Sequence, residues 1–428
     1  MKISEQLYRW FNREGNEELY SQGLSDTAAA NLPSNYLKLL GTNLLTQLSD
    51  ALSNPKTVLT WLMNSIGVPI SLTSLVVPLR ESGSMLPQIL IALKVKRYQY
   101  RKSLWLAGAV IQSVSLIGIG MVSVWFEGAA AGWLILLLLT IFSLARALVS
   151  VTSKDIVGKT VPKSKRGKLT GYASAFSSIL VLGAGVWIGS IDNSSIYAVL
   201  MILSGTLWYL ALYVYHTVHE PEGEVSVQQK TSPWNLLKTD SVLQRFITAR
   251  ALLLCSALTT PFYITLAQQY HQGNPRLLAY FVIATGIAGL VSSSVWGRRA
   301  DESSKMVMVY GAVISSLVGV VVILTITLSP TLQSFTWWYP LLVFILTVGY
   351  TAVRIGRKTY IVDVVEGNKR TDYVSISNTV IALVLLVLGV ASSLLSLISI
   401  PVVILVLSLF GLLGAYLSYR LPEVNEKP

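Results

Sequence analysis

Long apolar stretches alternate with short polar connections along most of the chain. The stretches last about 20 residues, the length that an α-helix needs to cross roughly 30 Å of hydrocarbon. They lack the regular alternation of apolar and polar residues that marks a membrane β-barrel. The pattern predicts an all-α integral membrane protein with twelve spans, at 38–64, 71–93, 103–125, 130–152, 168–190, 196–217, 243–268, 277–297, 306–328, 337–356, 374–397 and 400–419.

A polar stretch between Glu220 and Asp240 divides these spans into two sets of six. A weak internal repeat agrees with this division, because Gly108-Ala-Val-Ile111 recurs as Gly311-Ala-Val-Ile314 and Lys154 corresponds to Lys358 at nearly the same offset. We therefore expect an N-terminal segment, a first six-helix bundle, a linker, a second six-helix bundle and a C-terminal tail, at residues 1–37, 38–217, 218–242, 243–420 and 421–428.

Composition and charge agree with a membrane protein and indicate its orientation. Of 428 residues, 53% are hydrophobic and 13% are charged, whereas soluble proteins carry about 25% charged residues. Of the 33 Lys and Arg residues, 27 lie on the side of the termini and only Arg276 lies on the other side. The positive-inside rule then predicts cytoplasmic termini in a plasma membrane such as the bacterial inner membrane. The net charge of +12 reports this topology and contact with the lipid bilayer, and we expect no nucleic-acid partner.

The N-terminal segment and two tryptophans have sequence features that are typical of residues at the membrane surface. Apolar residues recur at helical spacing near the N-terminus, which is typical of an amphipathic helix on the membrane, and a frayed cytosolic tail is the alternative. Trp337 and Trp338 fall near a span end, as interfacial aromatic residues do.

A charged segment between the eighth and ninth spans carries Gly297, Arg298, Asp301 and Lys305. This pattern resembles the cytoplasmic loop signature of the major facilitator superfamily, and the basic loop at 161–168 is similar to another loop of that family. The resemblance covers about residues 38–420 and implies two parallel six-helix repeats with the substrate bound between them. We expect Gly297 to permit a tight turn and Asp301 to pair with a loop cation, so that the four residues form a cytoplasmic gate.

Two features depart from the family pattern. The first-half counterpart of the gate has Lys94 in place of the Gly and Tyr98 in place of the Asp, so an Asp-centred gate is in doubt there. The fifth span lacks the Gly-Pro step of drug antiporters, and the spacing of Gly185 and Gly189 predicts close helix packing instead.

Ionisable residues inside the spans are the strongest indication of function, because a charge near the bilayer centre costs about 2.5–3.5 kcal/mol or more unless it is paired or hydrated. Most of them fall on spans 1, 4, 7 and 10, which line the central cavity in the family, and the full set is Asp50, Lys56, Arg80, Glu81, Arg146, Arg250 and Arg354. We interpret the two acids as proton-coupling residues and the four arginines as groups that attract the substrate or exchange partners. A structural network within the first bundle is the alternative, and snorkelling to the interface would also explain some arginines and Lys56.

Polar and aromatic residues on the same spans are candidates for the cavity wall, although most membrane aromatics serve packing. They are Thr46, Ser53, Thr57, Trp61, Gln88, Tyr263 and Tyr350. The single cysteine, Cys255, excludes an internal disulfide, and no nucleotide-binding or nucleophile motif occurs. We therefore expect no enzymatic activity, no cofactor and no metal.

Together these features predict a monomeric secondary transporter that moves a small anionic or zwitterionic solute by alternating access, coupled to protons. An exporter of drugs or metabolites with the same fold is one alternative. A receptor or a lipid scramblase, in which the charges form a fixed lock, is the alternative from another class.

Overall fold

The computed structural model describes residues 3–11, 24–95, 97–191, 193, 195–222, 234–271, 273–364 and 369–423. In these residues the regular structure is helical, without strands, and ten helices are long and apolar enough to cross a membrane. The first two predicted spans are each broken into several helices and are not among these ten. Together with the ten they complete twelve spans, so the predicted fold of two six-helix bundles is confirmed.

The first bundle contains an interrupted pair of spans followed by four continuous helices. Span 1 consists of α2 (Asp26–Leu52) and α3 (Val58–Ser65), and α2 begins before the predicted start at residue 38. Span 2 consists of α4 (Ile70–Thr73), α5 (Val76–Met85) and α6 (Gln88–Val95). The others are α7 (Lys102–Trp125), α8 (Gly128–Thr160), α9 (Lys163–Gly189) and α10 (Ile196–His216).

The second bundle follows the short helix α11 (Trp234–Thr239). Its first span consists of α12 (Ser241–Leu253), α13 (Cys255–Leu258) and α14 (Thr260–Tyr270). The remaining helices are α15 (Pro275–Glu302), α16 (Ser304–Leu328), the 3₁₀ helix η2 (Pro330–Ser334), α17 (Trp338–Val364), α18 (Lys369–Ser396) and α19 (Ile400–Tyr419).

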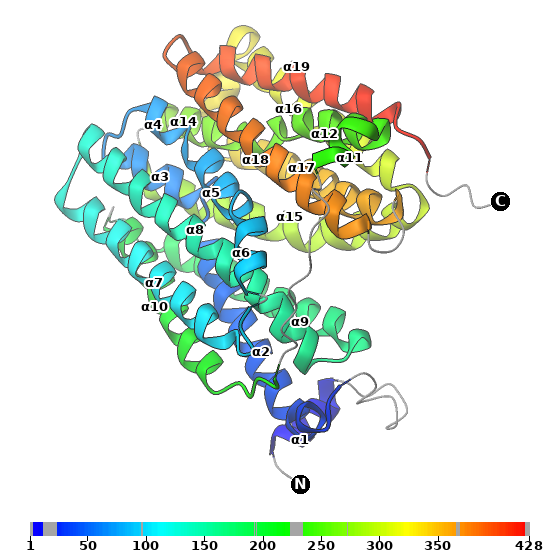
Figure 1. Cartoon of the computed structure of the whole chain (residues 1–428). Helices are drawn as coiled ribbons and strands as arrows, with labels where there is room; N and C mark the ends of the chain where they lie inside the picture. The colour runs from blue at the N-terminus through cyan, green and yellow to red at the C-terminus, as the bar shows by residue number, and fades with distance from the viewer. Residues whose placement is uncertain are drawn as a thin grey trace.

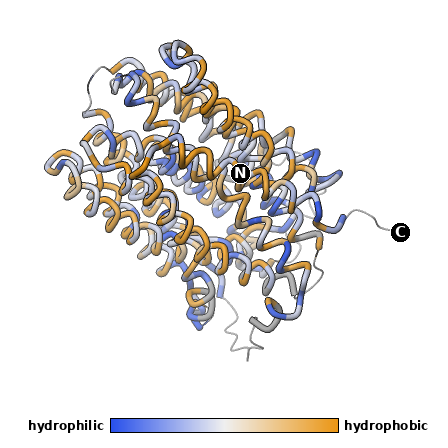
Figure 2. The backbone as a smooth tube through the Cα atoms, turned by 90° about the horizontal axis from the view of Figure 1, so that it is seen from above, coloured by the Kyte–Doolittle hydropathy of each residue, from blue (hydrophilic) through white to orange (hydrophobic). Residues whose placement is uncertain are grey.

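The two bundles lie side by side, with both chain termini at the same end of the helices (Figure 1). We call this end the terminal side. Hydrophobic residues run along most of each helix, and hydrophilic residues are more frequent at helix ends near the C-terminus (Figure 2). This distribution suits helices whose middle parts face lipid and whose ends face water.

Close packing of small residues joins the bundles along α9 and α15. A Cβ atom added at Gly185 would lie 2.7 Å from the Ile283 side chain, and one added at Gly189 would lie 3.2 Å from Ala279. Neither position has room for a larger side chain without movement of its neighbour, so the prediction of close packing at these glycines is confirmed. The second long contact between the bundles joins α5 and α18.

The bundles are also joined at the side opposite the termini. The Asn64 side chain donates a hydrogen bond to Thr265 Oγ1 at 2.9 Å, and Ser393 Oγ donates to the Ser71 carbonyl at 2.7 Å. Here α3 packs on α14, whereas among the described residues no comparable packing joins their terminal-side counterparts α2 and α12. The structure is therefore closed on the side opposite the termini.

The expected turn at Gly297 is wrong. Gly297 lies inside α15, which continues to Glu302, and the chain turns at Ser303. Ser303 has an extended backbone, and its hydroxyl accepts a hydrogen bond from the Met306 amide as the cap of α16. A capping hydroxyl thus replaces the glycine turn, and the helix can continue through a Gly because its neighbours supply the hydrogen-bond ladder.

The N-terminal helix α1 (Ile3–Phe11) packs against the first bundle. Tyr8 meets Tyr36 of α2 edge to face at a centroid distance of 5.2 Å, and Phe11 meets Tyr172 of α9 at the same distance. For residues 3–11 the alternative of a frayed tail is therefore wrong.

Candidate functional site

An acid and two arginines from three helices meet inside the first bundle. Both terminal nitrogens of Arg146 on α8 donate hydrogen bonds to the two carboxylate oxygens of Asp50 on α2. Arg80 Nη2 on α5 lies 3.5 Å from Asp50 Oδ1. Two parallel hydrogen bonds between a guanidinium and a carboxylate are the strongest common form of ion pair, so Arg146 is the primary partner of Asp50.

These three side chains are partly accessible even though they lie within the spans. Side-chain exposure is 24% for Asp50, 29% for Arg146 and 13% for Arg80. A fully packed ion pair would show almost none. The carboxylate is therefore not sealed into the packed core of the first bundle.

Local sequence explains how the helices bring the charges together. Asp50 occupies the last turn of α2, directly before the interruption of span 1. On α5, a Cβ atom at Gly83 would lie 2.7 Å from the Ser143 side chain, so the glycine lets α5 approach α8 closely. Arg80 also lies over the Phe142 ring, with 4.6 Å between the guanidinium carbon and the ring centroid.

Glu81 faces cations from both bundles. It lies within electrostatic range of Lys56, Arg80, Arg146 and, on α17 of the second bundle, Arg357. Among the described side chains it forms no ion pair within 4.0 Å. Glu81 is therefore an acid whose charge is shared among several cations, while Asp50 has a dedicated partner.

Sequence reasoning missed Arg357 because it placed the end of the tenth span at residue 356, while α17 continues to Val364. The predicted candidate on the same helix, Arg354, is exposed, and Arg357 is half-buried. The helical spacing of three residues would have revealed that both belong to one face.

Lys56 points into the interface between the bundles. Its ammonium nitrogen lies 3.4 Å from the centroid of the Tyr350 ring on α17, the geometry of a cation–π interaction. This contact argues against the alternative that Lys56 snorkels outward to the membrane surface. Tyr350, predicted as a cavity-wall residue, thus contacts a cation of the first bundle.

Arg250 is held by the neighbouring helix and does not reach the membrane surface. It is 7% exposed, and it donates hydrogen bonds to Ser377 Oγ at 2.6 Å and to Asn378 Oδ1 at 2.9 Å on α18. Its Nε atom is buried without a hydrogen-bond partner. The sequence analysis did not single out Ser377 or Asn378, although a Ser-Asn pair near the start of an apolar span was a visible signal.

The other predicted wall residues are mostly packed. Trp61, Tyr263 and Thr57 are buried, and Trp61 meets Phe281 of the second bundle at a centroid distance of 6.2 Å. In this state they seal the interface and line no accessible space. The remaining three, which donate hydrogen bonds to carbonyls three or four residues earlier in the chain, are Thr46, Ser53 and Gln88.

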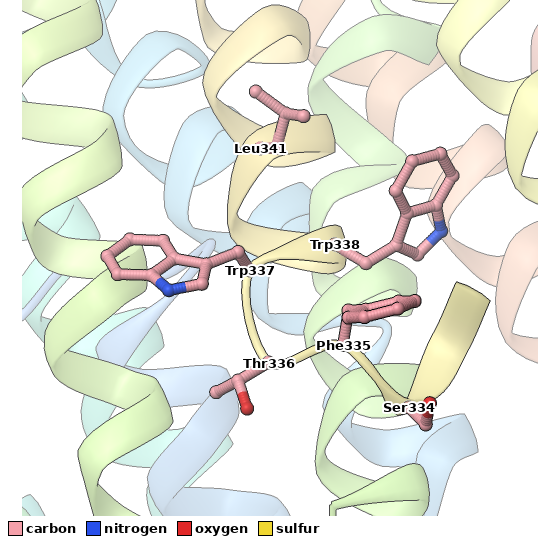
Figure 3. Close-up of a pocket in the computed structure, with 6 residues that line it drawn as sticks. All are labelled: Ser334, Phe335, Thr336, Trp337, Trp338 and Leu341. Atoms are coloured by element: carbon pink, nitrogen blue, oxygen red, sulfur yellow. The ribbon is translucent and has the colours of Figure 1, made fainter. Parts of the chain in front are cut away.

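Aromatic residues surround a pocket of about 460 Å³ at the start of α17, far from the charged cluster (Figure 3). Trp338 lies beside Phe335 there, while Trp337 points the opposite way and meets Tyr280 with 4.3 Å between centroids. Trp337 is 61% exposed. The arrangement agrees with interfacial aromatics, and no charged group lines the pocket.

Ionic contacts hold the loops on the terminal side. In the first bundle, Asp155 on α8 pairs with Arg101 and Lys159, and Glu220 accepts hydrogen bonds from the backbone amides of Arg101 and Lys102. The loop that lacks the family's Asp is thus anchored by acids from elsewhere in the chain.

In the second bundle, the acid that anchors the predicted gate comes from the C-terminal tail. Lys305 lies 2.7 Å from the Glu423 carboxylate, and Ser303 Oγ donates to the same carboxylate at 2.7 Å. The predicted gate residues Arg298 and Asp301 are both exposed at the end of α15.

Comparison with known proteins gives the family and the fold. The family model described as Major Facilitator Superfamily matches residues 39–389. A search of curated proteins finds no match. The chain is similar to the inward-open xylose transporter from E. coli, with a TM-score of 0.68, 14% identity, and coverage of 92% of this chain and 97% of that chain.

Two further solved structures illustrate the range of similar proteins. One is a nucleoside transporter, with a TM-score of 0.67, 12% identity, and coverage of 90% of this chain and 99% of that one. The other is a bacterial homologue of the iron transporter ferroportin in an inward-facing state, with a TM-score of 0.64, 15% identity, and coverage of 91% and 98%. At such identities the likeness concerns the fold alone.

Proposed function

The chain belongs to the major facilitator superfamily, and from this premise we propose that it is a proton-coupled secondary transporter of a small organic anion or zwitterion. It works by alternating access between the two bundles as a monomer. Both termini face the cytoplasm, and the protein resides in a plasma membrane such as the bacterial inner membrane.

The observation that carries the proposal is the accessible ion pair between Asp50 and Arg146 inside the first bundle. A charge at this depth is costly unless it is paired or hydrated, and Asp50 has both a partner and a partly exposed side chain. Protonation of Asp50 would remove its negative charge and release Arg146, whose planar guanidinium suits a carboxylate or phosphate. The ionised Asp50 carboxylate and an anionic substrate would then compete for the same arginine, so protonation of Asp50 would favour substrate binding.

The sign of the substrate follows from the balance of charges near the site. Four cations face two acids there, which leaves a positive potential that attracts anions. The groups are Lys56, Arg80, Arg146 and Arg357 against Asp50 and Glu81.

The test begins with a ligand. Thermal-shift measurements on the purified protein, with organic acids, amino acids, sugar phosphates and hydrophobic cations, identify a compound that stabilises it. Uptake of this compound into proteoliposomes is then measured for wild type, Asp50→Asn and Glu81→Gln, with Asp26→Asn as a control that removes an exposed acid from the same helix as Asp50. We expect both test variants to lose their dependence on a proton gradient while the control keeps it. Unchanged proton dependence in both would contradict the proposal, as would selective binding of hydrophobic cations.

A further inference from the structure

A second group of cations gathers between the bundles on the terminal side of the central cluster. Lys358 on α17 lies within electrostatic range of Arg354, Arg357, Arg250 and, from α8 of the first bundle, Lys154. All four named neighbours are positive. Both bundles thus place cations near Lys358. Among the described side chains, no acid is among its electrostatic neighbours.

The symmetry of the fold explains why the two bundles meet here with like charges. Lys154 and Lys358 occupy corresponding positions of the two repeats, 204 residues apart. Equivalent positions on equivalent helices are related by the axis between the bundles, so both lie at the same depth. On α17 itself, Arg354, Arg357 and Lys358 follow the i, i+3, i+4 spacing of one helix face, and like charges at i, i+4 destabilise a helix.

The two acids described in this neighbourhood, Asp155 and Glu81, are engaged elsewhere. Asp155, which follows Lys154 in the chain, pairs with Arg101 and Lys159 within the first bundle. Glu81 lies within range of Arg357 but is shared with Lys56 and two arginines of the central cluster. The cations at the terminal-side end therefore keep a surplus of positive charge.

One buried donor has no protein partner at this place. Arg250 is more than nine-tenths buried, its two terminal nitrogens bind α18, and its Nε atom has no hydrogen-bond partner. A buried donor without a partner is costly and is usually satisfied by water or by a ligand. It lies within range of both Arg357 and Lys358.

We propose that Lys154, Arg250, Arg354, Arg357 and Lys358 form an anion-binding site at the terminal-side mouth between the bundles, separate from the Asp50 pair. Its ligand carries a phosphate or carboxylate group and makes its first contact with the protein there, before Arg357 passes it toward the arginines of the central cluster. The positive-inside rule alone accounts for cations facing lipid headgroups around the rim, whereas Lys154 and Lys358 come from different bundles and lie within electrostatic range of each other.

The inference rests on the proposed transport of an anion, and a labelling experiment tests it without transport. Ser150 lies one turn before Lys154 on α8 and is half-buried. In the full chain with Ser150→Cys, reconstituted in neutral phosphatidylcholine, we measure the labelling rates of a negatively and a positively charged methanethiosulfonate reagent. The native Cys255 is fully buried, so wild type provides the unlabelled background.

We expect the negative reagent to react about tenfold faster than the positive one, because a basic mouth concentrates anions. Arg357→Gln with Lys358→Gln should bring the two rates close together. Lys163→Gln with Arg299→Gln removes two exposed cations from the same side of the membrane and should leave the preference intact. If the first double variant fails to fold, Lys154→Gln alone tests the same prediction from the other bundle.

Protection then identifies the source of the anion. Slower labelling in the presence of inorganic phosphate supports a site for a free solute. Slower labelling only when phosphatidylglycerol replaces phosphatidylcholine supports a site of the same chemistry occupied by a lipid headgroup. Equal rates for the two reagents, or no protection by either anion, would overturn the proposal, while loss of proton dependence in Asp50→Asn would still support the proposed function.

Discussion

At the scale of single residues, the Asp50 carboxylate faces two arginines but can neutralise only one. Its two hydrogen bonds go to Arg146, and Arg80 stays at 3.5 Å. Arg80 is stabilised in addition by the Phe142 ring. Asp50 is thus the acid that compensates the charge of both arginines. Its protonation would leave two cations without a dedicated acid.

This dependence predicts non-additive effects on stability. Asp50→Asn leaves Arg146 unpaired and should destabilise the protein by about 1–3 kcal/mol, below the 3–5 kcal/mol of fully buried pairs because these side chains are partly accessible. Arg146→Gln should cost a similar amount, and the double variant should cost less than the sum. Thermal melting in detergent measures the three variants. Strict additivity would mean that the pair does not interact in the folded protein.

The clamp on the C-terminal tail predicts a dependence on pH. Hydrogen bonding to Lys305 and Ser303 lowers the pKa of Glu423 below its usual value of 4.5, against a smaller opposing effect of burial. The stabilisation is therefore present above the unfolded pKa and is lost as the pH falls through the folded pKa, below about 4.5. Wild type should melt slightly higher than Glu423→Gln at pH 7, and the difference should vanish in acid. A constant difference down to pH 3 would contradict this account.

At the scale of helices, the close contacts between the bundles depend on small residues. A Cβ atom at Gly389 on α18 would lie 2.4 Å from Pro78 on α5, two residues before Arg80. This contact places the broken second span, with its two charges, against the second bundle. The sequence contains no pattern that pairs Gly389 with Pro78, because the two residues come from different repeats.

Enlarging this glycine should therefore disturb both packing and transport. Gly389→Leu should lower the stability by about 1–3 kcal/mol through overpacking and reduce uptake. Gly183→Leu is the matched control, because a Cβ at Gly183 meets nothing within 4 Å. Melting temperature and uptake are measured for both. Similar behaviour of the two variants would show that the contact between α5 and α18 does not constrain the protein.

The elements also show what sequence patterns can predict. Apolar runs of about 20 residues define spans reliably, because the bilayer fixes their length. The breaks within spans 1, 2 and 7 were not predicted, since Pro78 and Pro87 only weaken a helix and neighbouring packing decides where it ends. Asp50, Arg80 and Arg146 stood out as charges in apolar runs. Their mutual contacts, and the role of Arg357, depend on helix lengths and crossings that no local pattern encodes.

At the scale of the whole molecule, the hydrogen bonds from Asn64 to Thr265 and from Ser393 to Ser71 close one side of the protein. Lys56 adds a contact to Tyr350 deeper in the interface. In the proposed transport cycle, these contacts break when the other side closes.

Covalent linkage of the closed side should stop the transport cycle. In the variant with Asn64→Cys and Thr265→Cys, oxidation should join α3 to α14 and abolish uptake, and a reductant should restore it. The same variant under reducing conditions is the internal control. Full uptake by a protein that is completely cross-linked would show that the closed side need not open.

The most direct test of the proposed coupling is proton movement itself. Wild type and Asp50→Asn are reconstituted in vesicles that contain a pH-sensitive dye. The anion found by thermal shift is added outside, with no pH difference imposed across the membrane. We predict that the luminal pH changes with wild type at a rate proportional to anion flux, and that Asp50→Asn shows no such change. An equal pH change in Asp50→Asn, or anion uptake by wild type without any pH change, would contradict the assignment of Asp50 as the residue that couples protons to transport.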